Sequence, residues 1–140
     1  MSVDHRAEAL RWLSFAVGDL EAARSHRGRH VRPRIVAFEA QQCAEKALKA
    51  ALILEGIEPR RTHDLEELRG RLPDGWRVKT HPSDLARLSD YAAESRYPDD
   101  LEPVTPIQSA VAVRQAIAVL KVIRVDFDRR GVDTGKLVGR

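Results

Sequence analysis

The residues with the clearest chemical potential form a basic segment, residues 24–34, with the sequence RSHRGRHVRPR. It contains five arginines and two histidines and no acidic residue. Guanidinium groups suit phosphate oxygens, so this segment could face the phosphates of RNA or of a nucleotide. It holds no aromatic residue and offers no platform on which a base could stack. The simpler interpretation, which the sequence leaves open, is a solvated basic loop.

Two other features could indicate metal or thiol chemistry, and both are better explained without it. His26 and His30 are four residues apart, the spacing of two metal ligands on a helix, but the surrounding arginines would repel a cation. The single cysteine, Cys43, excludes an internal disulfide and a zinc site built from cysteines. We therefore expect a buried Cys43, no metal site and no cofactor.

A second group of polar residues lies within the stretch 38–56, FEAQQCAEKALKAALILEG. The apolar periodicity of this stretch predicts one long helix. Glu45 precedes Lys49 by four residues, the favourable order for an ion pair on a helix. An exposed pair of this kind stabilises a helix by only ~0.3–0.5 kcal/mol, so a purely structural role is the alternative. Gln41 and Gln42 could likewise be ordinary surface residues or contacts of a dimer.

The opposite side of the same helix carries small residues at steps of four and three, which would let a neighbouring helix approach closely. These are Ala40, Ala44, Ala47 and Ala51. The sequence does not decide whether this stripe faces the core or a second subunit.

Start and stop signals place further helices around this central one. We expect a first helix over residues 4–25 and a short third helix capped by Thr62. A fourth should begin at Pro82-Ser83, before which Trp76 and Val78 pack back onto the bundle. The last helix should begin with a capping box at Thr105-Pro106-Ile107-Gln108 and extend to Arg129.

These helices predict an all-α protein, an antiparallel up-and-down bundle of four to five helices. In such a bundle successive connections alternate between two ends, which would place the basic segment near Pro73. The same alternation would bring Arg61 and His63 close to Arg96 and Tyr97. Within the 140 residues we expect one domain, residues 1–130, and a flexible C-terminal tail, residues 131–140.

Composition agrees with this class of fold. Aromatic residues make up only 5% of the chain, so the core should consist mainly of aliphatic side chains and alanine. The net charge of +3 is only mildly basic. No apolar run approaches the ~20 residues that a membrane span needs, and the N-terminal segment is charged throughout. We therefore expect a cytoplasmic protein.

Three short motifs, in order, carry a resemblance to a known family. They are QQCAEKALKA (41–50), RTHDL (61–65) and SRYP (95–98), placed between two long flanking helices. This arrangement resembles the HEPN domain, a small nucleotide-binding helical domain. It is most similar to the stand-alone prokaryotic form that is paired with a minimal nucleotidyltransferase. The likeness covers about residues 5–128.

The resemblance implies a helical bundle that forms a homodimer and gathers polar residues around a cleft for a nucleotide or RNA. It implies a nucleotidyltransferase protein as partner, in a toxin–antitoxin-like pair. The implied site residues are Gln42, Glu45, Lys46 and Lys49 on the central helix, Arg61, His63 and Asp64 in the second motif, and Arg96 and Tyr97 in the third. In this setting Tyr97 could stack on a base and His63 could transfer a proton.

The chain departs from the family where ribonuclease activity is concerned. Many HEPN relatives are metal-independent ribonucleases with an arginine four to six residues before a histidine, but no histidine follows Arg96. A split catalytic pair, Arg96 with His63, is the alternative that keeps such an activity. A third hypothesis is a structural or adaptor dimer, in which the alanine stripe and the apolar last helix serve dimerisation only. The motifs have structural alternatives of their own: His63-Asp64 would only cap the third helix, and Arg96-Tyr97-Pro98 would only be a structural stop.

Overall fold

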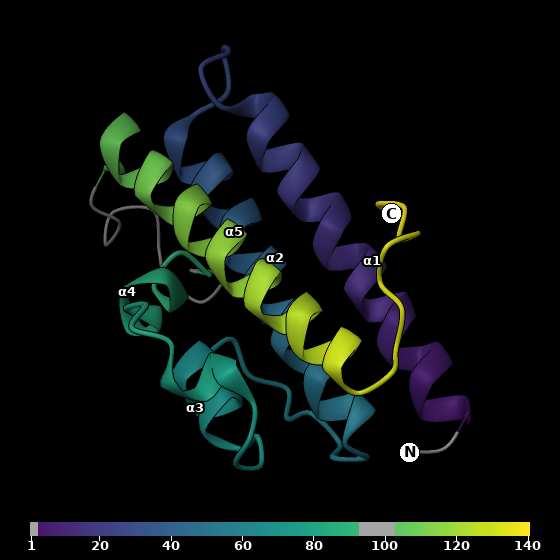
Figure 1. Ribbon diagram of the computed structural model, residues 1–140. Helices are drawn as coiled ribbons and strands as arrows, with labels where there is room; N and C mark the ends of the chain where they lie inside the picture. Colours follow the sequence, from purple (N-terminus) through teal and green to yellow (C-terminus); the bar gives the residue numbers. More distant parts are fainter. Residues whose placement is uncertain (1–2, 93–102) are drawn as a thin grey trace.

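The computed structural model describes residues 3–92 and 103–140, and all of its regular elements are helical. Three long helices form the bundle (Figure 1): α1 (Val3–His26), α2 (Pro33–Leu54) and α5 (Pro106–Arg129). Shorter helices connect α2 to α5, namely α3 (Leu65–Gly70), the 3-10 helix η1 (Arg77–Thr80) and α4 (Leu85–Ser89). The predicted all-α fold is confirmed.

α2 is the central helix because it packs against both α1 and α5. Its alanine stripe is fully buried: Ala40, Ala44, Ala47 and Ala51 each have 0% exposure. Small side chains at these steps let the backbones of neighbouring helices come close. The stripe therefore belongs to the core of one chain. Cys43 is buried beside it, as expected, and burial raises the pKa of its thiol, which makes the thiolate scarce.

Local signals place most helix ends where the sequence predicts them. Thr105 and Gln108 form a reciprocal capping box at the start of α5, directly before Pro106. Gly56, with φ 74°, follows the end of α2 in the left-handed conformation that glycine favours. At α3 the cap is Asp64 and not Thr62, because the Asp64 carboxylate accepts the backbone N–H groups of the first turn.

The strict up-and-down alternation is wrong for the last helix. Arg130, at the end of α5, contacts Glu55, at the end of α2 (Nε–Oε1 3.3 Å), so the two helices run in the same direction. The reason is that α3 and α4 are only 6 and 5 residues long and do not cross the bundle. The turn at residues 73–75 therefore lies near this end, since Gly75 is close to Arg130 and Trp76 donates to Glu55. The basic segment joins α1 to α2 at the other end of α2 (Figure 1).

Trp76 and Val78 pack into the core, as predicted. Trp76 meets Phe127 of α5 edge to face, with ring centroids 5.9 Å apart, and its indole N–H donates to Glu55 (2.8 Å). The Arg130 guanidinium lies over the same indole at 3.9 Å. These contacts fix the segment between α2 and α5 to the ends of both helices.

Residues 131–140 lie along α1 (Figure 1). Val132 and Thr134 are buried, and the backbone N–H of Arg140 donates to the carbonyl of Ser14 (3.1 Å). Gly18 permits this approach, since a Cβ there would clash with the carbonyl oxygen of Arg140. The sequence predicts that this segment is a flexible tail, but in the structure it packs against α1.

Candidate functional site

The candidate site is organised around a buried carboxylate, that of Glu45 on α2. This residue is only 4% exposed. Its Oε1 accepts hydrogen bonds from Gln41 Nε2 (3.1 Å) and His63 Nδ1 (2.8 Å), and its Oε2 accepts one from Lys49 Nζ (3.1 Å). We call Gln41, Glu45, Lys49 and His63 the Glu45 cluster.

The helix itself brings three members of the cluster together. Gln41, Glu45 and Lys49 are four residues apart and lie on one side of α2. His63 comes from the loop between α2 and α3, and Gln41 holds this loop in place by donating to the His63 carbonyl (3.2 Å). The loop is also fixed after His63, where the Leu65 N–H donates to Ser89 Oγ of α4 (2.9 Å). The imidazole is thus positioned from both sides.

The electrostatics of the cluster favour an ionised Glu45. Burial by itself would raise the pKa of Glu45, but the three hydrogen bonds to its carboxylate and the adjacent ammonium charge hold that pKa below its ordinary value. Lys49, whose side chain is 12% exposed, neutralises this buried charge. An ionised carboxylate can only accept hydrogen bonds, so His63 donates through Nδ1. In the neutral ring Nε2 is then the basic nitrogen, the group that could accept a proton.

The His63 side chain is 45% exposed, in contrast to the buried carboxylate that orients it. Arg61, two residues earlier in the same loop, is exposed as well. Arg60 is also exposed and pairs with Glu67 of α3 (2.9 Å). The surface at this loop therefore presents the oriented imidazole of the cluster and, beside it, the guanidinium of Arg61, which suits an anionic ligand.

Lys46 does not join the Glu45 cluster. Its ammonium group pairs with Asp19 of α1 (2.7 Å) and lies 5.9 Å from the centre of the Phe15 ring. Lys49 makes a comparable contact with Trp12, at 6.0 Å. The two lysines therefore tie α2 to α1, and Lys46 points to a different part of the surface from His63.

The remaining predicted site residues have different positions. Asp64 caps α3 by accepting the N–H groups of Glu66 (3.0 Å) and Glu67 (3.2 Å), a structural role. Gln42 donates to Gln41 Oε1 (2.7 Å) and so lies one step from the cluster. Arg96 and Tyr97 lie outside the described residues, so the predicted pairing of Arg96 with His63 stays a prediction.

Gln41 is the member of the cluster that sequence reasoning missed. The sequence suggests a surface or dimer-contact residue, yet Gln41 is 0% exposed and bridges Glu45 to the loop of His63. A glutamine four residues before a glutamate, on the side of the helix that carries Lys49, was the available signal. Its partner in the loop is 22 residues away and could not be read from spacing.

Elsewhere in the described structure there is less evidence for a functional site. An open hollow of about 510 Å³ lies between α1, α5 and residues 133–135, and it is lined by Leu20, Lys121, Arg124 and Asp128 among others. None of the predicted site residues that the structure describes lines it. Within residues 3–92 and 103–140 no group of three or more histidine, cysteine or acidic side chains could hold a metal ion. In the same ranges no helix is long and apolar enough to cross a membrane.

Comparison with known proteins decides the family. The sequence matches the HEPN domain over residues 9–126, which includes α2, the loop of His63 and nearly all of α5. The chain belongs to the HEPN family. No curated protein matches the sequence.

Two solved structures share the fold of this HEPN chain. TT1696 from Thermus thermophilus is 28% identical with a TM-score of 0.69, over 82% of this chain and 94% of that one. ST0689, an archaeal HEPN homologue, is also 28% identical with a TM-score of 0.67, over 84% of this chain and 96% of that one. The similarity thus spans nearly the whole of each relative and confirms the HEPN-like bundle.

Proposed function

We propose that this HEPN chain is a cytoplasmic nucleotide- or RNA-binding module that acts, as a homodimer, with a nucleotidyltransferase partner in a toxin–antitoxin-like pair. The observation that carries the binding role is the hydrogen bond between buried Glu45 and exposed His63. A protein that buries a carboxylate to hold an exposed imidazole has fixed a group that can meet a ligand. Membership of the HEPN family supports a nucleotide or RNA as that ligand.

The buried and the exposed residues of this site have different roles. Lys49 and Glu45 neutralise each other below the surface, so they position His63 and leave ligand contact to the exposed groups. The exposed groups are Arg61, whose guanidinium can donate hydrogen bonds to phosphate oxygens, and His63, whose Nε2 can accept one from a ribose hydroxyl or a base N–H. A basic loop in front of a neutralised interior favours anions over cations.

Binding of ATP and of a 12-nucleotide single-stranded RNA to the purified protein tests this role. Arg61→Gln and His63→Ala should each weaken the binding of the ligand at least fivefold, because the first removes a phosphate contact and the second removes an oriented hydrogen-bond acceptor. Arg71→Gln removes an exposed arginine elsewhere and should leave binding unchanged. Equal binding by all four proteins would contradict the assignment of the site.

The partnership is tested separately from the site. The neighbouring reading frame should encode a small nucleotidyltransferase, and the two proteins, expressed together, should purify as one complex. An isolated gene, or a neighbour of this class that does not co-purify, would remove the partner from the proposal while leaving the binding role intact.

Metal-independent ribonuclease activity is a second candidate, and the oriented imidazole of His63 favours it. A carboxylate that accepts from Nδ1 makes Nε2 the basic nitrogen, the arrangement in which histidine transfers protons. Cleavage of total RNA in EDTA by the wild type, but not by His63→Ala or Arg96→Ala, would establish this activity. If all three proteins are inert, binding without cleavage is the function. If binding is also absent, the structural or adaptor dimer is the remaining hypothesis.

A further inference from the structure

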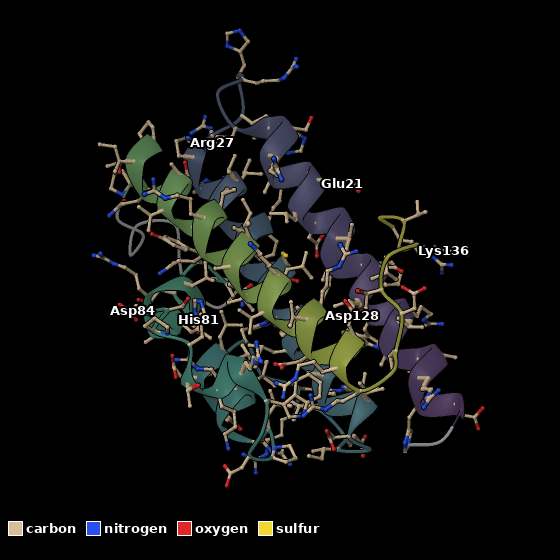
Figure 2. The ribbon with its side chains drawn as sticks, in the orientation of Figure 1. Glu21, Arg27, His81, Asp84, Asp128 and Lys136 are labelled. Atoms are coloured by element: carbon tan, nitrogen blue, oxygen red, sulfur yellow. The ribbon has the colours of Figure 1, made fainter. Side chains whose placement is uncertain are left out.

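The connection between α1 and α2 carries a high density of positive charge, and none of its residues belongs to the Glu45 cluster. We call residues 24–34 the arginine tip. Its five arginines exceed the net charge of +3 of the whole chain, so the rest of the protein is net negative. The tip lies at the end of the bundle where α1 joins α2, and Arg27 marks its position in Figure 2. All five guanidinium groups are exposed.

The arginines of the tip have no partners within the part of the chain that the structure describes. None of the five makes an ion pair or a side-chain hydrogen bond there. The tip's one paired side chain is His26, which contacts Glu39 of α2 (2.7 Å). By contrast Lys46, Lys49 and Arg130 are each paired with an acidic residue of the same chain. Charges that repel one another and lack internal partners favour an external polyanion.

The composition of the tip distinguishes nucleic acid from an acidic protein. Protein interfaces depend on buried aromatic and apolar anchors. The tip has no aromatic residue, and its one large aliphatic side chain, Val31, packs against the core of the bundle. What remains exposed is suited to phosphates, which bind guanidinium groups without needing an apolar contact.

The tip and the Glu45 cluster lie at two positions along α2, separated by a known length of helix. Arg34 and Glu45 are eleven residues apart, close to three whole turns, and therefore lie on the same side of the helix. Eleven residues correspond to about 17 Å at about 1.5 Å per residue. A ligand that contacts both regions is matched by about five stacked nucleotides, at roughly 3.4 Å each.

We infer that the arginine tip binds the phosphate backbone of a single-stranded RNA that also reaches His63. This inference rests on the proposed function and selects RNA over a mononucleotide as the ligand. The tip supplies affinity and no base preference, because it offers guanidinium groups and no stacking surface. Loss of the arginines of the tip should therefore weaken the binding of all RNA sequences to a similar extent.

The test uses two triple variants that remove the same charge. The tip variant is Arg27→Gln, Arg29→Gln and Arg32→Gln. The control is Arg6→Gln, Arg71→Gln and Lys136→Gln, three exposed cations elsewhere; Lys136 is labelled on the C-terminal segment in Figure 2. Binding of ATP and of 12-nucleotide RNAs of two sequences is measured from 50 to 300 mM salt. Circular dichroism and thermal unfolding verify that both variants fold.

The tip variant should bind both RNAs at least tenfold more weakly at low salt and bind ATP as the wild type does. Its plot of log K against log salt should be shallower by about 2, since each lost phosphate contact to a single strand removes about 0.7. The control should keep at least half of the wild-type affinity.

Three results would overturn the inference. Equal weakening by the tip and control variants would mean that net charge alone attracts RNA. Wild-type binding of ATP without RNA would remove the RNA role and leave the proposed function standing. Absence of binding to either ligand would remove both.

Discussion

The Glu45 cluster and the arginine tip are two groups of charges at different positions along α2, and they are built in opposite ways. In the cluster each charge has a partner, the carboxylate is buried, and one exposed imidazole is held in a fixed orientation. In the tip every guanidinium is exposed and none has a partner among the described residues. The cluster can determine the geometry of a ligand at one point, whereas the tip can attract charge over a Debye length of about 8 Å at physiological salt.

The comparison predicts very different costs of removing a charge, and the largest is for the cluster. Glu45→Ala should lower the free energy of unfolding by about 3–5 kcal/mol, because it leaves the ammonium of Lys49 buried without its partner. Chemical denaturation measures this. Glu67→Ala, which breaks the exposed pair with Arg60, should cost no more than about 1 kcal/mol.

A double variant shows whether the cost arises from the charge left behind. Glu45→Leu with Lys49→Met replaces both charges by apolar groups and should recover most of the stability that Glu45→Ala loses. If Glu45→Ala costs less than about 1 kcal/mol, or if the double variant is as unstable as the single one, the cluster is not the buried ion-pair network described above.

Acid should affect the two regions differently as well. The pKa of Glu45 in the folded protein lies below the ordinary 4.5, so the unfolded chain takes up this proton first as the pH falls. The contribution of Glu45 is therefore complete above about pH 4.5 and is lost as the pH falls from there through the folded-state pKa. Unfolding curves at pH 7 and at several values below 4.5 measure it.

In Glu45→Gln this part of the acid dependence should disappear. The triple tip variant should keep the acid dependence of the wild type, because arginine remains protonated throughout this range. If Glu45→Gln loses stability at acid pH as the wild type does, other carboxylates cause the loss of stability in acid.

The smallest effect on stability is expected at the tip. Arg27→Gln, Arg29→Gln and Arg32→Gln together should change the free energy of unfolding by less than about 0.5 kcal/mol, since exposed side chains without partners contribute little to folding. Relief of repulsion between the arginines would make the change slightly stabilising. A loss of more than about 1 kcal/mol would indicate that the tip serves the fold and would weaken the case for a ligand.

Much of the fold could be predicted because its signals are local. Thr105, Pro106 and Gln108 specify the start of α5 through contacts within one turn, and Gly56 specifies the end of α2 through its own backbone. The alanine steps of α2 predict a close helix contact in the same way. The short helices were harder to predict: the fourth helix, expected to begin at Pro82-Ser83, begins at Leu85 and already ends at Ser89.

The residue types of the candidate site, on α2 and in one loop, could be predicted from the sequence. Which partner each of these side chains contacts could not. Lys46 and Lys49 are equivalent in sequence, three residues apart on the polar side of one helix. In the structure Lys46 pairs with Asp19, 27 residues away, and Lys49 pairs with Glu45 beside His63. A difference of one helical step decides which neighbour each lysine meets.

The sequence by itself determined that this protein is a helical bundle with a polar, basic hairpin and HEPN motifs, because periodicity, caps and residue types act over a few residues. Only the tertiary structure decided that α5 runs parallel to α2, that Gln41 is buried, and that Glu45 holds His63. These depend on contacts across 18 or more residues, which the packing of the short helices and loops selects. The arginine tip could be recognised from the sequence alone. The Glu45 cluster, which would share its RNA ligand, could be recognised only from the tertiary structure.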